Sequence, residues 1–193
     1  MLPAADSVGA MAFPTVAELS ELLAPAVADF GLDLENVKAT PAGKKSVIAV
    51  AVDADERPDL DRLEEVSKRL SDLLDAAEER GELRLGAGYT LQVTTPGIDT
   101  LLTAPRHWRR NRHRLVELTA EGETPQTWRI GPLDAAEETG GPVGADLSVR
   151  LLKVADSPRA VVQVEFSSAP EQETELTGAD FESLNTVTRK DDK

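Results

Sequence analysis

The chain has 193 residues and a formal net charge of −14, with 40% hydrophobic and 29% charged residues. This length allows one large domain or two small ones, and the apolar content is enough for a packed core. The absence of cysteine excludes disulfide bonds and thiolate metal sites, and the acidic balance argues against a general cationic surface for nucleic acid.

The N-terminal part of the sequence predicts an extension, a helix and a hairpin. Residues 1–12 are small and without pattern, and they lack the basic and apolar regions of a signal peptide, so we expect a disordered extension of a cytoplasmic protein. From Pro14 to Phe30, apolar residues recur every three or four positions, which predicts a helix. Residues 32–40 and 46–53 then predict two strands joined by a Pro/Gly turn.

A second helix and a third strand complete the first predicted domain. Asp59 is the predicted N-cap of a helix whose apolar stripe runs from Leu60 to Ala77. Residues 89–95 alternate between apolar and polar side chains and predict a half-buried strand. Residues 13–104 therefore predict an α/β domain of order α-β-β-α-β, with helices covering one face of a small sheet.

The second half of the sequence predicts a small β-rich domain and a tail. Short β-like runs separated by turn signals predict a small barrel or sandwich over residues 113–168, and these runs lie at 113–120, 127–130, 145–152 and 160–167. Residues 169–193 are acidic and predict a mostly disordered tail. Within this tail, the FESL sequence at 181–184 is able to dock or to form a helical turn.

The most unusual feature is RHWRRNRHR at residues 106–114, which we call the basic segment. It contains five arginines, both histidines of the chain, one tryptophan and no acid. Thr103 and Pro105 predict the start of a short helix here, with Thr103 as the N-cap. On such a helix Arg106, Arg110 and Arg114 recur every four residues and share one side. Residues 105–112 are thus interpreted as a basic linker between the two domains.

Two interpretations of the basic segment stay open. In the first it binds RNA, because arginine pairs with phosphate and tryptophan stacks on bases. The candidate RNA-binding residues are Arg106, His107, Trp108, Arg109, Arg110, Arg112 and Arg114. In the second interpretation the arginines of an interdomain linker pair with the protein's own acids, and Trp108 packs where the domains meet.

The remaining motifs predict structure rather than chemistry. The TTPGID sequence is a tight turn after a strand, and we assign a structural role to Thr95, Pro96, Gly97 and Asp99. The acidic DADERPDLD sequence only loosely resembles a calcium loop, since Pro58 stands where the sharp turn needs glycine. No catalytic motif occurs, and we predict no catalytic residue, metal or cofactor.

A series of motifs resembles the bacterial ribosome maturation factor RimP family. VTTPGID is followed by TAPRHW and RLVEL, and the LLAPAVADFGLDLENVK, PDLDRLEEVSKRLSDLLD and RAVVQVEF sequences match in the same order. The resemblance covers roughly residues 15–167. It departs at Thr100, Leu101 and Leu102, which replace the family's Arg-Pro-Leu, and it is poor over 131–149. Any role of that family arginine is therefore not carried over.

The resemblance implies a fold and a function. It implies a KH-like N-terminal domain, a small C-terminal Sm-like β-barrel, and a non-enzymatic factor that assists assembly of the small ribosomal subunit. The implied partners are immature small subunits, their rRNA and small-subunit ribosomal protein twelve, and we expect a monomer without membrane contact. We hypothesise that the basic segment contacts rRNA while acidic surface holds the ribosomal protein. The alternatives are an acidic protein-interaction adaptor without RNA contact and a hydrolase with an unrecognised site.

Overall fold

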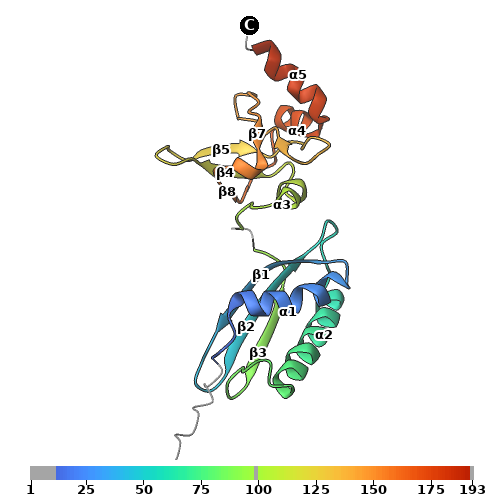
Figure 1. Cartoon of the computed structure of the whole chain (residues 1–193). Coiled ribbons are helices and arrows are strands. Elements are labelled where there is room, and N and C mark those ends of the chain that lie inside the picture. Colours follow the sequence, from blue (N-terminus) through green and yellow to red (C-terminus); the bar gives the residue numbers. More distant parts are fainter. Residues whose placement is uncertain (1–11, 98–99, 192–193) are drawn as a thin grey trace, which may run out of the picture. The chain divides into compact units, whose positions relative to one another are not determined.

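The computed structural model describes residues 12–97 and 100–191, with side chains described as far as residue 188 (Figure 1). The chain divides into two compact units, Met1–Pro96 and Gly97–Lys193, which we call the N-terminal and C-terminal units. This division lies earlier than the predicted boundary at residue 104. Among the described residues, no helix is long and apolar enough to span a bilayer.

The N-terminal unit has the predicted order α-β-β-α-β. Its elements are α1 (Val16–Ala28), β1 (Asp33–Thr40), β2 (Ser46–Asp53), α2 (Leu60–Glu79) and β3 (Tyr89–Thr94). The three strands form a sheet of order β1-β2-β3, in which β1 and β2 are antiparallel and β2 and β3 are parallel. The prediction of a small mixed α/β domain is therefore confirmed.

Local sequence signals begin both helices of this unit. The Thr15 hydroxyl accepts a bond from the Glu18 N–H, and the Glu18 carboxylate accepts one from the Thr15 N–H, so α1 begins with a capping box. Asp59 caps α2 as predicted, because its carboxylate accepts the Arg62 N–H at 2.8 Å. Leu60, predicted as part of the apolar stripe, is 83% exposed because it begins the helix and lies beyond its buried face.

The core of the N-terminal unit lies between the two helices and one face of the sheet (Figure 1). Alternate residues of the central strand β2 are fully buried, among them Ile48, Val50 and Val52. Leu19 and Leu23 of α1 and three residues of α2 pack in the same cluster; the α2 residues are Val66, Leu70 and Leu74. The period of two in the strand and of three to four in the helices places these side chains together.

In its described residues, the C-terminal unit combines short strands with three α-helices and one 3₁₀ helix. Its elements are α3 (Pro105–Arg110), β4 (Leu115–Thr119), β5 (Gln126–Arg129), β6 (Thr139–Gly140), β7 (Leu152–Lys153), the 3₁₀ helix η1 (Val154–Asp156), β8 (Arg159–Val162), α4 (Glu171–Gly178) and α5 (Phe181–Asp191). One antiparallel sheet has the order β5-β4-β8, and β6 pairs with β7 in a second.

The strands of this unit do not form a closed barrel within the described ranges. Single bridges extend the pairing, namely Leu101–Val161, Arg129–Val143, Leu133–Gly140 and Val143–Val149. Most of the strand predicted at 145–152 is replaced by a turn. There the Asp146 carboxylate accepts both the N–H and the hydroxyl of Ser148, and Leu147 has a φ of 65°. The side-chain bonds compete with strand pairing, which explains why β7 begins only at Leu152.

The prediction of a mostly disordered tail at 169–193 is corrected by α4 and α5. Asp180 precedes α5, and its carboxylate accepts the N–H and the hydroxyl of Ser183, both at 2.8 Å. Leu184 is 1% exposed and lies so close to Gly141 that a Cβ there would be 2.7 Å from it. The FESL sequence therefore docks through Leu184, which composition alone could not reveal because one buried leucine anchors an otherwise polar segment.

Candidate nucleic-acid interface

The basic segment begins as the short helix α3, with Pro105 at its first position. The predicted cap, Thr103, is wrong, because the N-cap is Ala104 and its side chain makes no capping bond. Instead, Nδ1 of His107 accepts the N–H groups of Thr103 and Ala104 at 3.1 and 3.2 Å. The Ala104 N–H belongs to the N-cap and is a donor that the helix itself leaves without a partner. His107 therefore holds the start of α3 and needs an unprotonated Nδ1 to do so.

The helix ends at Arg110, so the predicted single face of three arginines is only partly formed. Arg106 and Arg110 lie four residues apart on α3 and share a side. The chain then turns: the Asn111 amide donates to the His107 carbonyl at 2.8 Å, and His113 adopts a φ of 72°. Arg114 consequently follows the turn and does not continue the helical face, which corrects that prediction.

Trp108 is a core residue of the C-terminal unit. It is 1% exposed and packs with a cluster that includes Leu102, Val116 and Ile130. Its Nε1 is buried and has no hydrogen-bond partner among the described residues. In this conformation the ring is not presented for stacking on a base. The expectation that Trp108 takes part in RNA binding is therefore replaced by a packing role within its own unit.

Arg112 and His113 fasten the turn to the end of α4. The guanidinium of Arg112 donates to the carbonyls of Thr177 and Ala179 at 2.7 and 2.6 Å. A cation is favoured there, because the last carbonyls of a helix lack partners and carry partial negative charge. Nδ1 of His113 lies 2.8 Å from the Thr177 hydroxyl. Burial, together with the positive charges of Arg112 and Arg129, lowers the pKa of His113.

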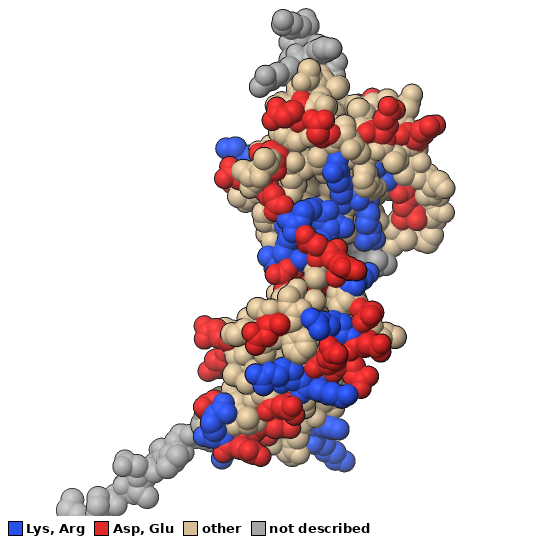
Figure 2. All heavy atoms as spheres, turned by 90° about the vertical axis from the view of Figure 1, so that its right-hand side faces the viewer, with Lys and Arg blue, Asp and Glu red and all other residues tan. Residues whose placement is uncertain are grey.

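The other arginines of the basic segment are at least partly exposed. Arg109 forms an ion pair with Glu137, in which the two side chains are 41% and 37% exposed. Arg114 is exposed and donates to the amide oxygen of Asn111 at 3.0 Å. Figure 2 shows Lys and Arg side chains gathered on one face of the C-terminal unit, with Asp and Glu side chains beside them. The expected concentration of cations thus exists, but it lies next to acids.

The C-terminal unit also contains a buried ionic cluster that the sequence did not predict. The Arg129 side chain is 1% exposed and donates to both carboxylate oxygens of Glu165, at 2.9 and 2.7 Å. Its Nε donates to Glu173 at 2.6 Å, and its Nη1 donates to the His113 carbonyl at 2.8 Å. The bond from Arg129 lowers the pKa of Glu165. Arg129 therefore joins β5, the segment after β8, α4 and the turn of the basic segment.

A weak sequence signal for this cluster exists. Arg129 directly precedes Ile130 at the end of a predicted strand, and both residues are buried. A charged residue at a buried position needs a partner, so an arginine in this strand predicts a buried acidic partner. Its partners Glu165 and Glu173, however, are 36 and 44 residues away and resemble other acids of the chain.

The predicted TTPGID turn makes hydrogen bonds within the structure, one of them with Arg57 of the DADERPDLD sequence. The Pro96 carbonyl accepts a bond from the Arg57 guanidinium at 3.2 Å, and the Gly97 carbonyl accepts one from the Thr100 hydroxyl. Thr95 follows β3 directly, whereas Asp99 lies outside the described residues. A structural role of this turn stays a prediction. In the described part of the chain, no three His, Asp or Glu side chains are grouped to hold a metal ion.

Comparison with known proteins gives a consistent set of relatives. The RimP N-terminal domain family matches residues 22–99. A ribosome maturation factor RimP of Corynebacterium diphtheriae is 50% identical over 175 residues, covering 89% of this chain and 95% of the relative. Those of Corynebacterium aurimucosum and Corynebacterium kroppenstedtii are 46% and 38% identical over 188 residues, covering 94% and 90% of this chain and 100% of each relative. The similarity therefore extends over most of both units.

Proposed function

The chain belongs to the RimP family of ribosome maturation factors, and we propose that it binds immature small ribosomal subunits through contacts of the basic segment with rRNA. As a member of this family it acts in ribosome maturation and is not an enzyme. The observation that carries the proposal is five arginines without an acid in nine residues of a chain whose net charge is −14. We place this activity in the cytoplasm, where bacterial ribosomes mature.

Four arginines are proposed as the phosphate contacts, namely Arg106, Arg109, Arg110 and Arg114. The described contacts of Arg109 with Glu137 and of Arg114 with Asn111 are compatible with this role. The ion pair of Arg109 with Glu137 is solvent-exposed, and exposed pairs contribute about 0–1 kcal/mol. A phosphate offers a stronger, bidentate partner and releases counterions from the RNA. These magnitudes support exchange of the Glu137 carboxylate for an rRNA phosphate at Arg109.

The other candidates of the segment support the arrangement without touching RNA. His107 holds the start of α3, Trp108 packs below it, and Arg112 binds the end of α4. These three side chains fix the backbone from which the contacting arginines project. A fixed backbone lowers the entropy that would be lost on binding. The proposed RNA site is thus smaller than the predicted set, with supporting residues inside it.

A three-arginine variant tests the proposal. Arg106→Gln, Arg109→Gln and Arg110→Gln together remove three charges from one short helix. Each lost phosphate contact reduces the slope of log Kobs against log salt by about 0.7–0.9, so the total reduction is about 2–3. Co-sedimentation of the full chain with immature small subunits at several salt concentrations measures this slope. We expect weaker binding and a shallower slope for the variant.

A matched control removes three cations elsewhere in the same unit, by the changes Arg150→Gln, Lys153→Gln and Arg159→Gln. This variant has the same net charge, so it separates a local contact from a general electrostatic effect. Equal slopes for both variants would refute the proposed contact. Unchanged binding of the three-arginine variant would favour the alternative, an acidic adaptor that binds through protein surface alone.

We further propose that the acids of the C-terminal unit face a basic partner, small-subunit ribosomal protein twelve. Exposed glutamates on the β4–β5 connection and on α4 support this idea, and they are Glu121, Glu123, Glu171 and Glu175. We also propose an Sm-like barrel that is incompletely closed and a KH-like N-terminal unit. The antiparallel sheet β5-β4-β8 with its additional bridges and the α-β-β-α-β order support these assignments.

A further inference from the structure

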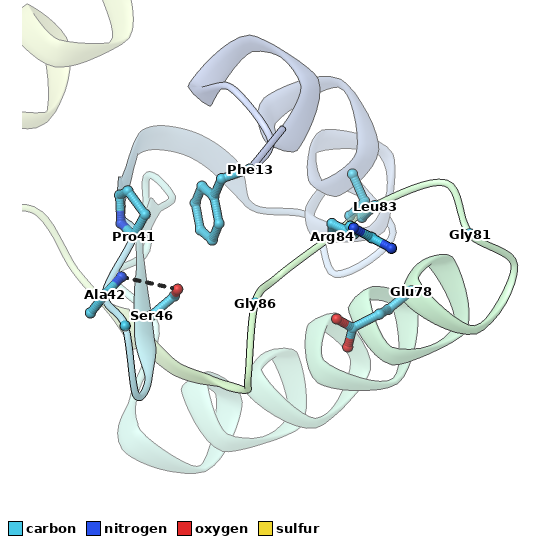
Figure 3. A pocket seen from close by; sticks show the side chains of 10 residues that line it. Phe13, Pro41, Ala42, Ser46, Glu78, Gly81, Leu83, Arg84 and Gly86 are labelled. Carbon is cyan, nitrogen blue, oxygen red and sulfur yellow. Dashed lines mark hydrogen bonds between the residues drawn. The ribbon is translucent and has the colours of Figure 1, made fainter. Parts of the chain in front are cut away.

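An open hollow of about 930 Å³ lies on the N-terminal unit, and its lining includes none of the residues discussed above as RNA contacts. Its walls are the connection between β1 and β2, the connection between α2 and β3, and Phe13 (Figure 3). The Phe13 ring faces the hollow from one side, while Arg84 and Glu78 lie across from it. The hollow therefore combines an aromatic surface with charged groups on a separate wall.

Three cations lie on the two connections that wall this hollow, and we call Lys44, Lys45 and Arg84 the hollow cations. Lys44 and Lys45 directly follow Gly43, which lines the hollow, and Arg84 lines it itself. All three residues are exposed, and none forms an ion pair with a described residue. They are thus available to an anion without displacing an internal partner.

Two acids of the connection after α2 and of the α2 end have local partners. The Glu78 carboxylate accepts the Leu85 N–H at 3.2 Å and so stabilises the connection after α2. Glu82 is bound by two nitrogens of Arg80, at 2.7 and 2.9 Å. The connection between β1 and β2 contains no acid at all. In a chain of net charge −14, this is a second local concentration of cations.

The walls of the hollow are held in place by local bonds. The Ser46 side chain is buried and accepts the Ala42 N–H at 3.3 Å, which fixes the turn that carries the lysines. The Ser46 N–H donates to the Gly88 carbonyl at 2.9 Å, so both connections meet at this residue. Gly86 has a φ of 82°, a conformation that favours glycine. The spacing between the two walls is therefore set by backbone contacts.

We propose that this hollow binds single-stranded RNA, with one base against Phe13 and phosphates on the hollow cations. Bases stack on aromatic rings irrespective of sequence, and cations beside the ring track the backbone. An acidic peptide would use the cations but would gain nothing from the ring. The site goes beyond the proposed function of the basic segment, because it lies on the other unit and uses other residues.

Fluorescence anisotropy with a labelled oligouridylate of about eight nucleotides tests this site in the full chain. The variant Lys44→Ser with Lys45→Ser removes two cations, and Lys68→Ser with Arg69→Ser is the matched control on exposed positions of α2. Each phosphate contact on single strands contributes about 0.7 to the salt slope, so we expect a reduction of about 1.4 for the first variant only.

The variant Phe13→Leu tests the stacking contact separately. Leucine keeps apolar packing against the core but offers no π-face. We expect the affinity for the oligonucleotide to fall on the order of tenfold with an unchanged salt slope. Thermal unfolding followed by circular dichroism shows whether the fold is retained. An oligonucleotide affinity of folded Phe13→Leu equal to that of the parent chain would overturn the stacking proposal.

The remaining outcomes separate this site from the proposed function. Equal salt slopes for the lysine variant and its control would overturn the hollow as an RNA site. Equally tight binding of an oligoglutamate peptide, lost in the same variant, would overturn it in favour of an acidic peptide site. The three-arginine variant of the basic segment belongs in the same assay. If only that variant loses the oligonucleotide, the hollow proposal fails while the proposed function stands.

Discussion

Arg129 is the residue whose loss should most strongly destabilise the C-terminal unit. The change Arg129→Met removes four hydrogen bonds, two to Glu165 and one each to Glu173 and the His113 carbonyl. The side chain is 1% exposed, and the Glu173 side chain that it leaves behind is only 10% exposed. An uncompensated charge then stays in a position with little access to water.

The expected cost follows from this burial. Removing one partner of a buried ion pair costs about 3–5 kcal/mol in free energy of unfolding. For a unit of this size, such a loss lowers Tm by more than about 10 °C. Arg159→Met is the control, because Arg159 is exposed in the same sheet, and its effect should lie within about 0.5 kcal/mol.

Urea unfolding followed by tryptophan fluorescence measures this effect. The chain has two tryptophans, Trp108 and Trp128, and both lie in the C-terminal unit, so the signal reports that unit. Replacing Glu165 and Glu173 by leucine together with Arg129→Met should recover much of the loss, since apolar residues replace a buried ionic cluster well. A loss below about 1 kcal/mol for Arg129→Met would refute the reasoning.

Three further predictions concern other contacts. Gly131→Ala should prevent native packing of the C-terminal unit, because the new Cβ would lie 2.0 Å from the backbone oxygen of Gly141; a native-like Tm would contradict this. Asp59→Ala should lower the free energy of unfolding of the N-terminal unit by about 1 kcal/mol through loss of the α2 cap, measurable by circular dichroism, and no change would argue against the cap. Arg129 lowers the pKa of Glu165, so their ion pair stabilises the fold at pH values above the ordinary carboxyl pKa. This stabilisation is lost as the pH falls through the lowered pKa of Glu165. The urea midpoint should therefore fall on acidification, and less steeply in Arg129→Met.

For the basic segment, the local sequence predicts the short helix but not the contacts of its side chains. Its composition and Pro105 predict a short cationic helix, and α3 is that helix. The sequence could not show that Trp108 turns inward or that Arg112 binds the end of α4, because both depend on segments distant in the chain. A run of arginines thus indicates positive charge, but the surrounding fold decides which of them remain available to a partner.

By itself, the sequence determined the elements of the N-terminal unit, because helix and strand periods and the Asp59 cap depend on near neighbours in the chain. Only the tertiary structure decided that the acidic end folds and docks. That docking depends on Leu184 reaching Gly141 and on Glu173 reaching Arg129 across the fold. Composition reports the average polarity of a segment, whereas docking depends on a few side chains whose partners lie far away in sequence.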